Sequence, residues 1–95
     1  MSGPHPYFVY LLWSPAGRRF YIGVTDDVSR RLAQHNAGIS TWTRRFAGSW
    51  QLLWSTSFPS LSEARCFERL LKRQKSGTGL WRLTGVEPPL DLPGS

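Results

Sequence analysis

The sequence carries its clearest pattern near the start, where residues 7–25 read YFVYLLWSPAGRRFYIGVT. Residues 7–13 are apolar throughout and residues 19–24 form a second, shorter run, as expected of buried strands. The Ser-Pro-Ala-Gly segment between them is typical of a tight turn. The stretch therefore predicts a β-hairpin. If its turn is tight, Tyr10 and Tyr21 lie opposite or nearly opposite each other, about 5 Å apart on one face.

The residues after the hairpin predict helices and one more strand. Side-chain oxygens at 25–27 can cap a helix over 28–37, and Gly38 suits its C-terminal end. Irregular structure at 38–49 precedes a strand at 50–57. Ser60 and Glu63 form a capping box that opens a second helix reaching about Gln74, and one further short helix fits within 76–85.

Together these elements predict an α+β fold, a small three-stranded antiparallel sheet flanked by helices. Trp50, Trp54 and Phe58 fall on alternate strand positions and predict packing on one side of the sheet. The domain is expected to span 7–85, between a flexible N-terminus at 1–6 and a flexible, proline-rich tail at 86–95.

Charge is the most informative bulk property. The 95 residues hold 12 Lys and Arg against 6 Asp and Glu, a formal net charge of +6. Such an excess on a small domain predicts binding to a polyanion, most simply nucleic acid. The single cysteine, Cys66, cannot form an internal disulfide and fits a reducing compartment. Because there is no apolar run of about 20 residues and no signal peptide, we expect a soluble, cytoplasmic protein with no membrane partner.

Two charged groups on the first predicted helix share its apolar face. Val28, Arg31, Leu32 and His35 are spaced to lie on one face, whereas Arg30 points to solvent. The valine and leucine are expected in the core, which brings Arg31 and His35 to its edge. A snorkelling arginine and a structural histidine would explain the pattern. A bound anion is the alternative.

Glu68 has a similar place on the second helix. It borders the apolar stripe and has no local partner, whereas Glu63 is explained by the capping box. A half-buried carboxylate in a basic protein could pair with Arg31 or hold magnesium. The residue pattern alone leaves both open.

The segments Val9 to Leu12, Tyr21 to Thr25 and Arg30 to Asn36 closely resemble the signature of the GIY-YIG nucleases. The spacing of Tyr10, Tyr21, Arg31 and His35 agrees with that family, and Glu68 resembles its metal-binding glutamate. Of the first motif, only Tyr10 is kept. The chain looks most like the small single-domain bacterial members, which are related to structure-specific branch-cutting nucleases.

The resemblance implies metal-dependent hydrolysis of phosphodiester bonds in DNA repair, recombination or DNA processing. Glu68 would hold a single Mg²⁺ or Mn²⁺, and Arg31 would add positive charge at the phosphate. Tyr21, together with Tyr10, would orient the attacking water and take its proton. His35 could serve instead as the base, as a phosphate ligand or as a support for a tyrosine.

Six further residues are expected to contact nucleic acid. Gly23 would let a phosphate approach the backbone. Arg44 and Arg45 combine charge with the ring of Trp42, which suits unpaired bases unless Trp42 belongs to the core. Lys72 and Arg73, at the end of the second helix, could follow a phosphate backbone or complement the helix dipole.

The substrate is expected to be single-stranded, flapped or branched DNA, and RNA stays open. A homodimer or a protein partner could supply further binding surface. A catalytically silent nucleic-acid-binding module of the same fold is the rival hypothesis.

Overall fold

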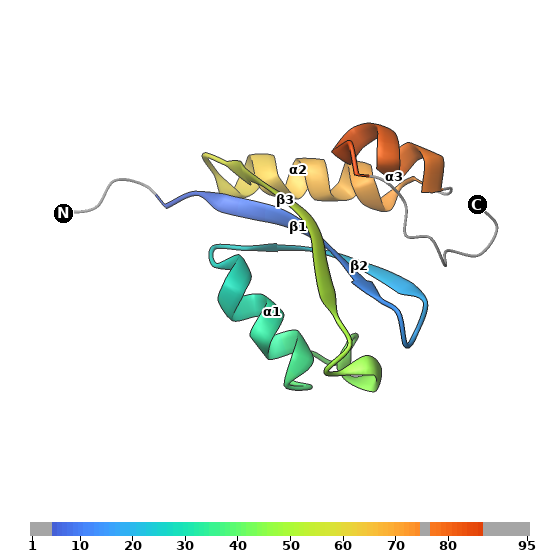
Figure 1. The fold of residues 1–95 in the computed structure, drawn as a ribbon. Coiled ribbons are helices and arrows are strands. Elements are labelled where there is room, and N and C mark those ends of the chain that lie inside the picture. The colour runs from blue at the N-terminus through green and yellow to red at the C-terminus, as the bar shows by residue number, and fades with distance from the viewer. Residues whose placement is uncertain (1–4, 75–76, 87–95) are drawn as a thin grey trace.

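The computed structural model describes residues 5–74 and 77–86. The predicted element order is confirmed, and the fold is α+β (Figure 1). Most of the predicted flexible ends, residues 1–4 and 87–95, lies outside the described residues. The elements are β1 (Tyr7–Ser14), β2 (Arg19–Thr25), α1 (Val28–Asn36), a 3₁₀ turn η1 (Arg44–Phe46), β3 (Gln51–Phe58), α2 (Leu61–Lys72) and α3 (Gly77–Thr84).

The sheet has three antiparallel strands in the order β2-β1-β3. The central strand β1 is the most deeply buried, which explains why its sequence is apolar on both faces. One face packs Val9 against α2 and α3, and the other packs Tyr10 and Leu12 against α1. Figure 1 shows this layering, with α1 on one side of the sheet and α2 and α3 on the other.

The predicted one-sided packing of β3 is wrong. Trp54 and Phe58 pack in the cluster under α2, but Trp50 packs with Tyr10 and Leu12 on the α1 side. The register explains the difference, because β3 carries one extra residue where its pairing with β1 shifts between Leu11 and Leu12. A single inserted residue reverses the alternation of faces across it, so Trp50, before the insertion, faces the side opposite to Trp54 and Phe58, which follow it.

Local capping fixes the ends of both main helices. The Asp27 side chain accepts from the Arg30 backbone N–H at 3.0 Å at the start of α1, and Gly38 follows its end with φ +81°. At the start of α2, the Ser60 hydroxyl accepts from the Glu63 backbone N–H at 3.2 Å and donates to its carboxylate at 3.0 Å. Both starts agree with the predicted caps.

Within the described ranges, none of the helices combines the length and the apolar character needed to cross a membrane.

Candidate active site

Tyr10 and Tyr21 face the same side of the hairpin but are not directly opposite. Tyr10 pairs with Gly23 and Tyr21 pairs with Leu12, so the two tyrosines are diagonal neighbours. Their ring centroids lie 6.2 Å apart. The two phenols therefore lie near each other as expected, although Tyr10 pairs with the residue two positions beyond Tyr21 instead of with Tyr21 itself.

His35 is fully buried rather than placed at the edge of the core. Its Nε2 lies 2.9 Å from the Tyr10 hydroxyl and its Nδ1 lies 2.6 Å from the Thr43 hydroxyl. Burial, assisted by the charge of Arg31, lowers the pKa of His35 from 6.5 to about 4. At neutral pH the imidazole is therefore uncharged, and both of its nitrogens are engaged.

Tyr10 is the second buried member of this group. Burial raises the pKa of Tyr10 to about 12, and the nearby Tyr21 adds to the shift, while Arg31 opposes it. A phenol with that pKa is a hydrogen-bond donor at neutral pH and not a base.

Gly23 has a packing role at this point. A Cβ atom built on Gly23 would lie 2.5 Å from the Tyr10 hydroxyl oxygen. The bare backbone expected to admit a phosphate thus admits the phenol of Tyr10.

Tyr21 differs from Tyr10 in its surroundings. It is half-buried, and its ring centroid lies 4.8 Å from that of His35. Its hydroxyl makes no hydrogen bond to any other residue in the described part of the chain. This phenol is therefore oriented by ring contacts and keeps its oxygen available.

Arg31 is half-buried beside these rings, and Nη1 donates to the Gln34 side-chain oxygen at 2.9 Å. Its charge acts on the pKa of both Tyr10 and His35. Arg30, as expected, points to solvent, where it pairs with Asp26. The α1 face thus brings one cation to the tyrosine pair.

Glu68 comes from α2, in the layer on the other side of the sheet. Its side chain is only 12% exposed, and its carboxylate pairs with the Lys72 ammonium at 2.9 Å rather than with Arg31. The Glu68 charge contributes to raising the pKa of Tyr10, so it lies within electrostatic reach of that phenol.

The donor set restricts which metal could fit. Among the described residues, no three His, Cys, Asp or Glu side chains gather as a metal cage. A single secluded carboxylate fits a hard cation such as Mg²⁺, which takes one or two carboxylates and completes its shell with water and substrate oxygens. It does not fit structural zinc.

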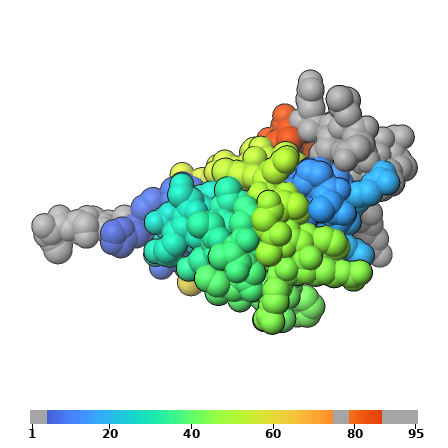
Figure 2. Space-filling view, turned by 60° about the horizontal axis from the view of Figure 1, so that its bottom comes forward, coloured from blue at the N-terminus to red at the C-terminus, as the bar shows by residue number. Residues whose placement is uncertain are grey.

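Trp42, Arg44 and Arg45 lie in the segment that joins α1 to β3. Trp42 is 85% exposed, so the alternative that it belongs to the core is wrong. Both arginines are exposed as well. Figure 2 shows α1 and this segment side by side, forming one continuous surface. Thr43, buried between these exposed residues, ties the segment to His35.

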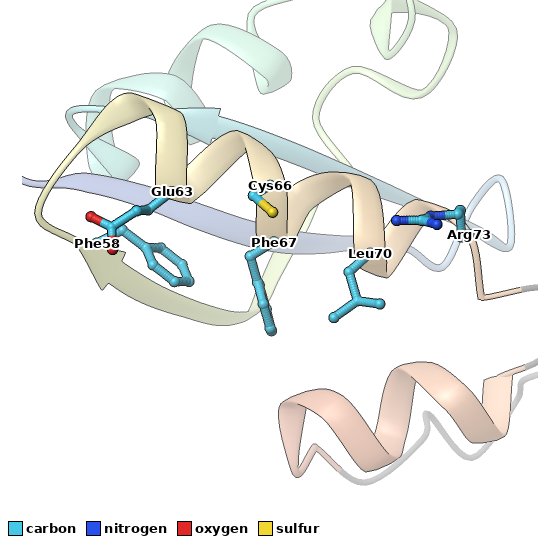
Figure 3. Close-up of a pocket in the computed structure, with 6 residues that line it drawn as sticks. All are labelled: Phe58, Glu63, Cys66, Phe67, Leu70 and Arg73. Atoms are coloured by element: carbon cyan, nitrogen blue, oxygen red, sulfur yellow. The ribbon is translucent and has the colours of Figure 1, made fainter.

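The structure separates Lys72 from Arg73. Lys72 lies on the Glu68 face of α2, and the exposed Arg65 flanks Glu68 on the same face. Arg73 instead lines an apolar pocket of about 380 Å³ with Phe58 (Figure 3). This pocket contains none of the predicted catalytic residues.

Sequence reasoning missed Thr43 and Arg65. Arg65 could have been found by helical spacing, since it precedes Glu68 by one turn. Thr43 had no such signal, because its contact with His35 depends on how the irregular segment folds back.

Comparison with known proteins assigns the sequence to a family. The sequence profile of the GIY-YIG catalytic domain matches residues 6–80. The chain belongs to the GIY-YIG family. Members of this family are endonucleases, so the chain has the fold of a nuclease family.

Individual relatives agree with this assignment. A UPF0213 protein of Cupriavidus pinatubonensis is 36% identical over 89 residues, which covers 94% of this chain and 98% of the relative. The structure-specific endonuclease subunit SLX1 of Meyerozyma guilliermondii is 42% identical over 79 residues, 77% of this chain but 27% of that longer protein. The solution structure of a UPF0213 protein from Bacillus halodurans matches with a TM-score of 0.51 and 29% identity, covering 82% of each chain.

Proposed function

We propose that this GIY-YIG protein is a metal-dependent endonuclease that hydrolyses phosphodiester bonds of unpaired, flapped or branched DNA during repair, recombination or DNA processing in the cytoplasm. The observation that carries the proposal is the arrangement of two unlike phenols beside one cation. Tyr10 is held by His35, whereas the Tyr21 hydroxyl is left available, and the Arg31 charge acts beside them. A domain that only binds nucleic acid has no need for this arrangement.

The two tyrosines take different roles in this proposal. Tyr21, in its phenolate form, orients the attacking water, accepts its proton and becomes the neutral phenol; its oxygen has no other partner among the described residues. Tyr10 donates a hydrogen bond to a substrate oxygen, consistent with its pKa of about 12. His35 supports Tyr10 and does not act as the base, since neither ring nitrogen is open to water. Arg31 lies against the phosphate and stabilises its negative charge.

Glu68 is the residue that would hold Mg²⁺ or Mn²⁺. When bound, such an ion supplies positive charge that stabilises the phosphate and the leaving oxygen. The Lys72 ammonium, 2.9 Å from the carboxylate, would have to move aside. Lys72 and Arg65 then stand on either side of Glu68 as partners for neighbouring phosphates.

Preference for unpaired DNA is supported by Trp42. A ring that is 85% exposed, two residues before the exposed Arg44 in the chain, offers a base a stacking surface in a cationic segment. Unpaired bases can reach such a surface, whereas bases inside a duplex cannot. The name of the Meyerozyma guilliermondii relative, a structure-specific endonuclease subunit, agrees with this preference and also with a protein partner or a second copy of the chain.

A panel of end-labelled oligonucleotides tests the proposal. Single-stranded, duplex, flapped and four-way branched DNA, together with single-stranded RNA, are incubated with the protein in Mg²⁺, Mn²⁺ or EDTA. We expect cleavage only with metal, strongest on the substrates that contain unpaired bases. Absence of cleavage from all five substrates in either metal would favour the silent binding module.

Two matched substitutions on α1 separate binding from chemistry. Arg31→Ala removes the cation beside the tyrosines, and Arg30→Ala removes the solvent-facing cation next to it. We expect Arg31→Ala to abolish cleavage with most binding kept, and Arg30→Ala to cleave like the wild type. Parallel loss of binding and cleavage in Arg31→Ala would refute its catalytic role.

A further inference from the structure

Thr43 is the buried residue that the proposed chemistry leaves unexplained. It stands at the N-cap of η1, where a threonine hydroxyl usually caps the helix, yet this side chain makes no cap hydrogen bond. Its hydroxyl instead lies 2.6 Å from His35 Nδ1. The Thr43 carbonyl accepts two hydrogen bonds that hold the backbone. One comes from the Phe46 N–H at 3.2 Å and the other from the Trp50 indole N–H at 2.9 Å. The hydroxyl is therefore held in place against His35.

Thr43, His35 and Tyr10 form a chain of three groups joined by two hydrogen bonds. The neutral imidazole brings one N–H and each hydroxyl brings one O–H, so three protons serve two bonds. One proton must be left over at an end of the chain. It is the Thr43 proton if Nδ1 carries the ring hydrogen, and the Tyr10 proton if Nε2 carries it.

The two ends differ in what surrounds them. Thr43 is fully buried, and within the described residues its hydroxyl has no hydrogen-bonding partner besides His35. An unsatisfied buried donor there is costly. The Tyr10 hydroxyl is buried as well, but it lies beside the half-buried Tyr21 and feels the negative charge of Glu68, and a substrate oxygen bound there would accept its hydrogen bond.

We infer that Thr43 is a positioning residue whose hydroxyl donates to His35 Nδ1, holds His35 as the Nε2–H tautomer and thereby directs the Tyr10 hydroxyl proton into the active site. Tyr10 then accepts from His35 and donates outward. The neutral state of His35 at pH 7 agrees with this arrangement. The catalytic consequence rests on the proposed nuclease function, whereas the tautomer does not.

The tautomer can be measured on the isolated protein without metal or substrate. Two-bond ¹H–¹⁵N correlation spectra of the ¹⁵N-labelled protein at pH 7 show which ring nitrogen carries the hydrogen, and the exposed His5 gives the reference signals of a free imidazole. We expect a protonated Nε2 and an unprotonated Nδ1 for His35. A protonated Nδ1 would overturn the inference, whether or not the protein cleaves DNA.

Two substitutions then test positioning. Thr43→Val keeps the shape and removes the hydroxyl, while Thr43→Ser keeps the hydroxyl. On the substrate cleaved by the wild type, we expect Thr43→Val to lower kcat about tenfold with little change in KM, as for one lost hydrogen bond, and Thr43→Ser to restore most of the rate. Equal rates for the two folded variants would refute the positioning role. Cleavage by neither the wild type nor any variant would refute the nuclease proposal, and the tautomer measurement would still decide the hydrogen-bond assignment.

Discussion

Substitution of Gly23 by alanine tests the packing that holds Tyr10 in place. The added Cβ would lie 2.5 Å from the Tyr10 hydroxyl oxygen and 2.7 Å from Cζ, well inside van der Waals contact. The Tyr10 side chain cannot easily move away, because its hydroxyl is hydrogen-bonded to the buried His35. The alanine should therefore displace Tyr10 and strain its hydrogen bond.

The expected cost follows from two opposing effects. Overpacking of a buried site typically costs about 1–3 kcal/mol. Gly23 does not have a positive φ, so alanine also gains about 0.4–1 kcal/mol by restricting the unfolded chain. The net loss in the free energy of unfolding is about 0.5–2 kcal/mol. For a domain of this size, each kcal/mol lost lowers Tm by roughly 4–8 °C.

Urea denaturation followed by tryptophan fluorescence measures this loss, and a double-mutant cycle with Tyr10→Phe isolates its cause. Because Tyr10→Phe removes the atom in shortest contact, Gly23→Ala should cost less in that background. Equal costs in both backgrounds, or a Gly23→Ala protein at least as stable as the wild type, would show that the added Cβ does not clash with the Tyr10 hydroxyl.

Three further predictions concern pH, stacking and metal affinity. Because the pKa of His35 falls from 6.5 to about 4 on folding, the folded protein binds fewer protons than the unfolded chain between those pH values. The contribution of His35 to stability should therefore be complete above pH 6.5 and decline as the pH falls toward 4. Urea titrations of His35→Gln should show a shallower decline with falling pH than those of His5→Gln. Trp42→Ala should leave stability within about 0.5 kcal/mol but weaken binding to a single-stranded oligonucleotide by about 1–3 kcal/mol in fluorescence anisotropy, with Trp42→Phe in between. Lys72→Met should release the Glu68 carboxylate and tighten Mn²⁺ binding in calorimetry, and unchanged or weaker binding would mean that the carboxylate is not the ligand.

The fold followed from the sequence where its determinants are local. The hairpin turn, the Ser60 capping box and the apolar period of α2 each involve residues a few positions apart, and all appear in the structure. The extra residue in β3 was not predictable, because a bulge is defined only by the strand that pairs with it. This extra residue places Trp50 on the α1 side, where the Trp50 indole N–H donates a hydrogen bond to the Thr43 carbonyl.

The sequence indicated candidate site residues more readily than the contacts that these residues make with one another. Helical spacing placed His35 at the edge of the core, whereas the tertiary structure shows it fully buried between two hydroxyls. The sequence left Glu68 with either Arg31 or a metal as partner, whereas the structure pairs it with Lys72. Glu68 and Lys72 are four residues apart on one helix, so the spacing was sufficient to predict this pair. Only the absence of an Arg31 contact required the tertiary structure.

Single-turnover cleavage by Glu68→Gln and Glu63→Gln tests the nuclease proposal most directly. Both substitutions remove one negative charge from α2 with almost no change in shape, and glutamine preserves the capping box at Glu63. With the preferred oligonucleotide and saturating Mg²⁺ or Mn²⁺, we expect the Glu63→Gln rate to equal that of the wild type and Glu68→Gln to show no cleavage above background. Cleavage by Glu68→Gln at the wild-type rate would contradict the proposed role of the Glu68 carboxylate as the metal ligand.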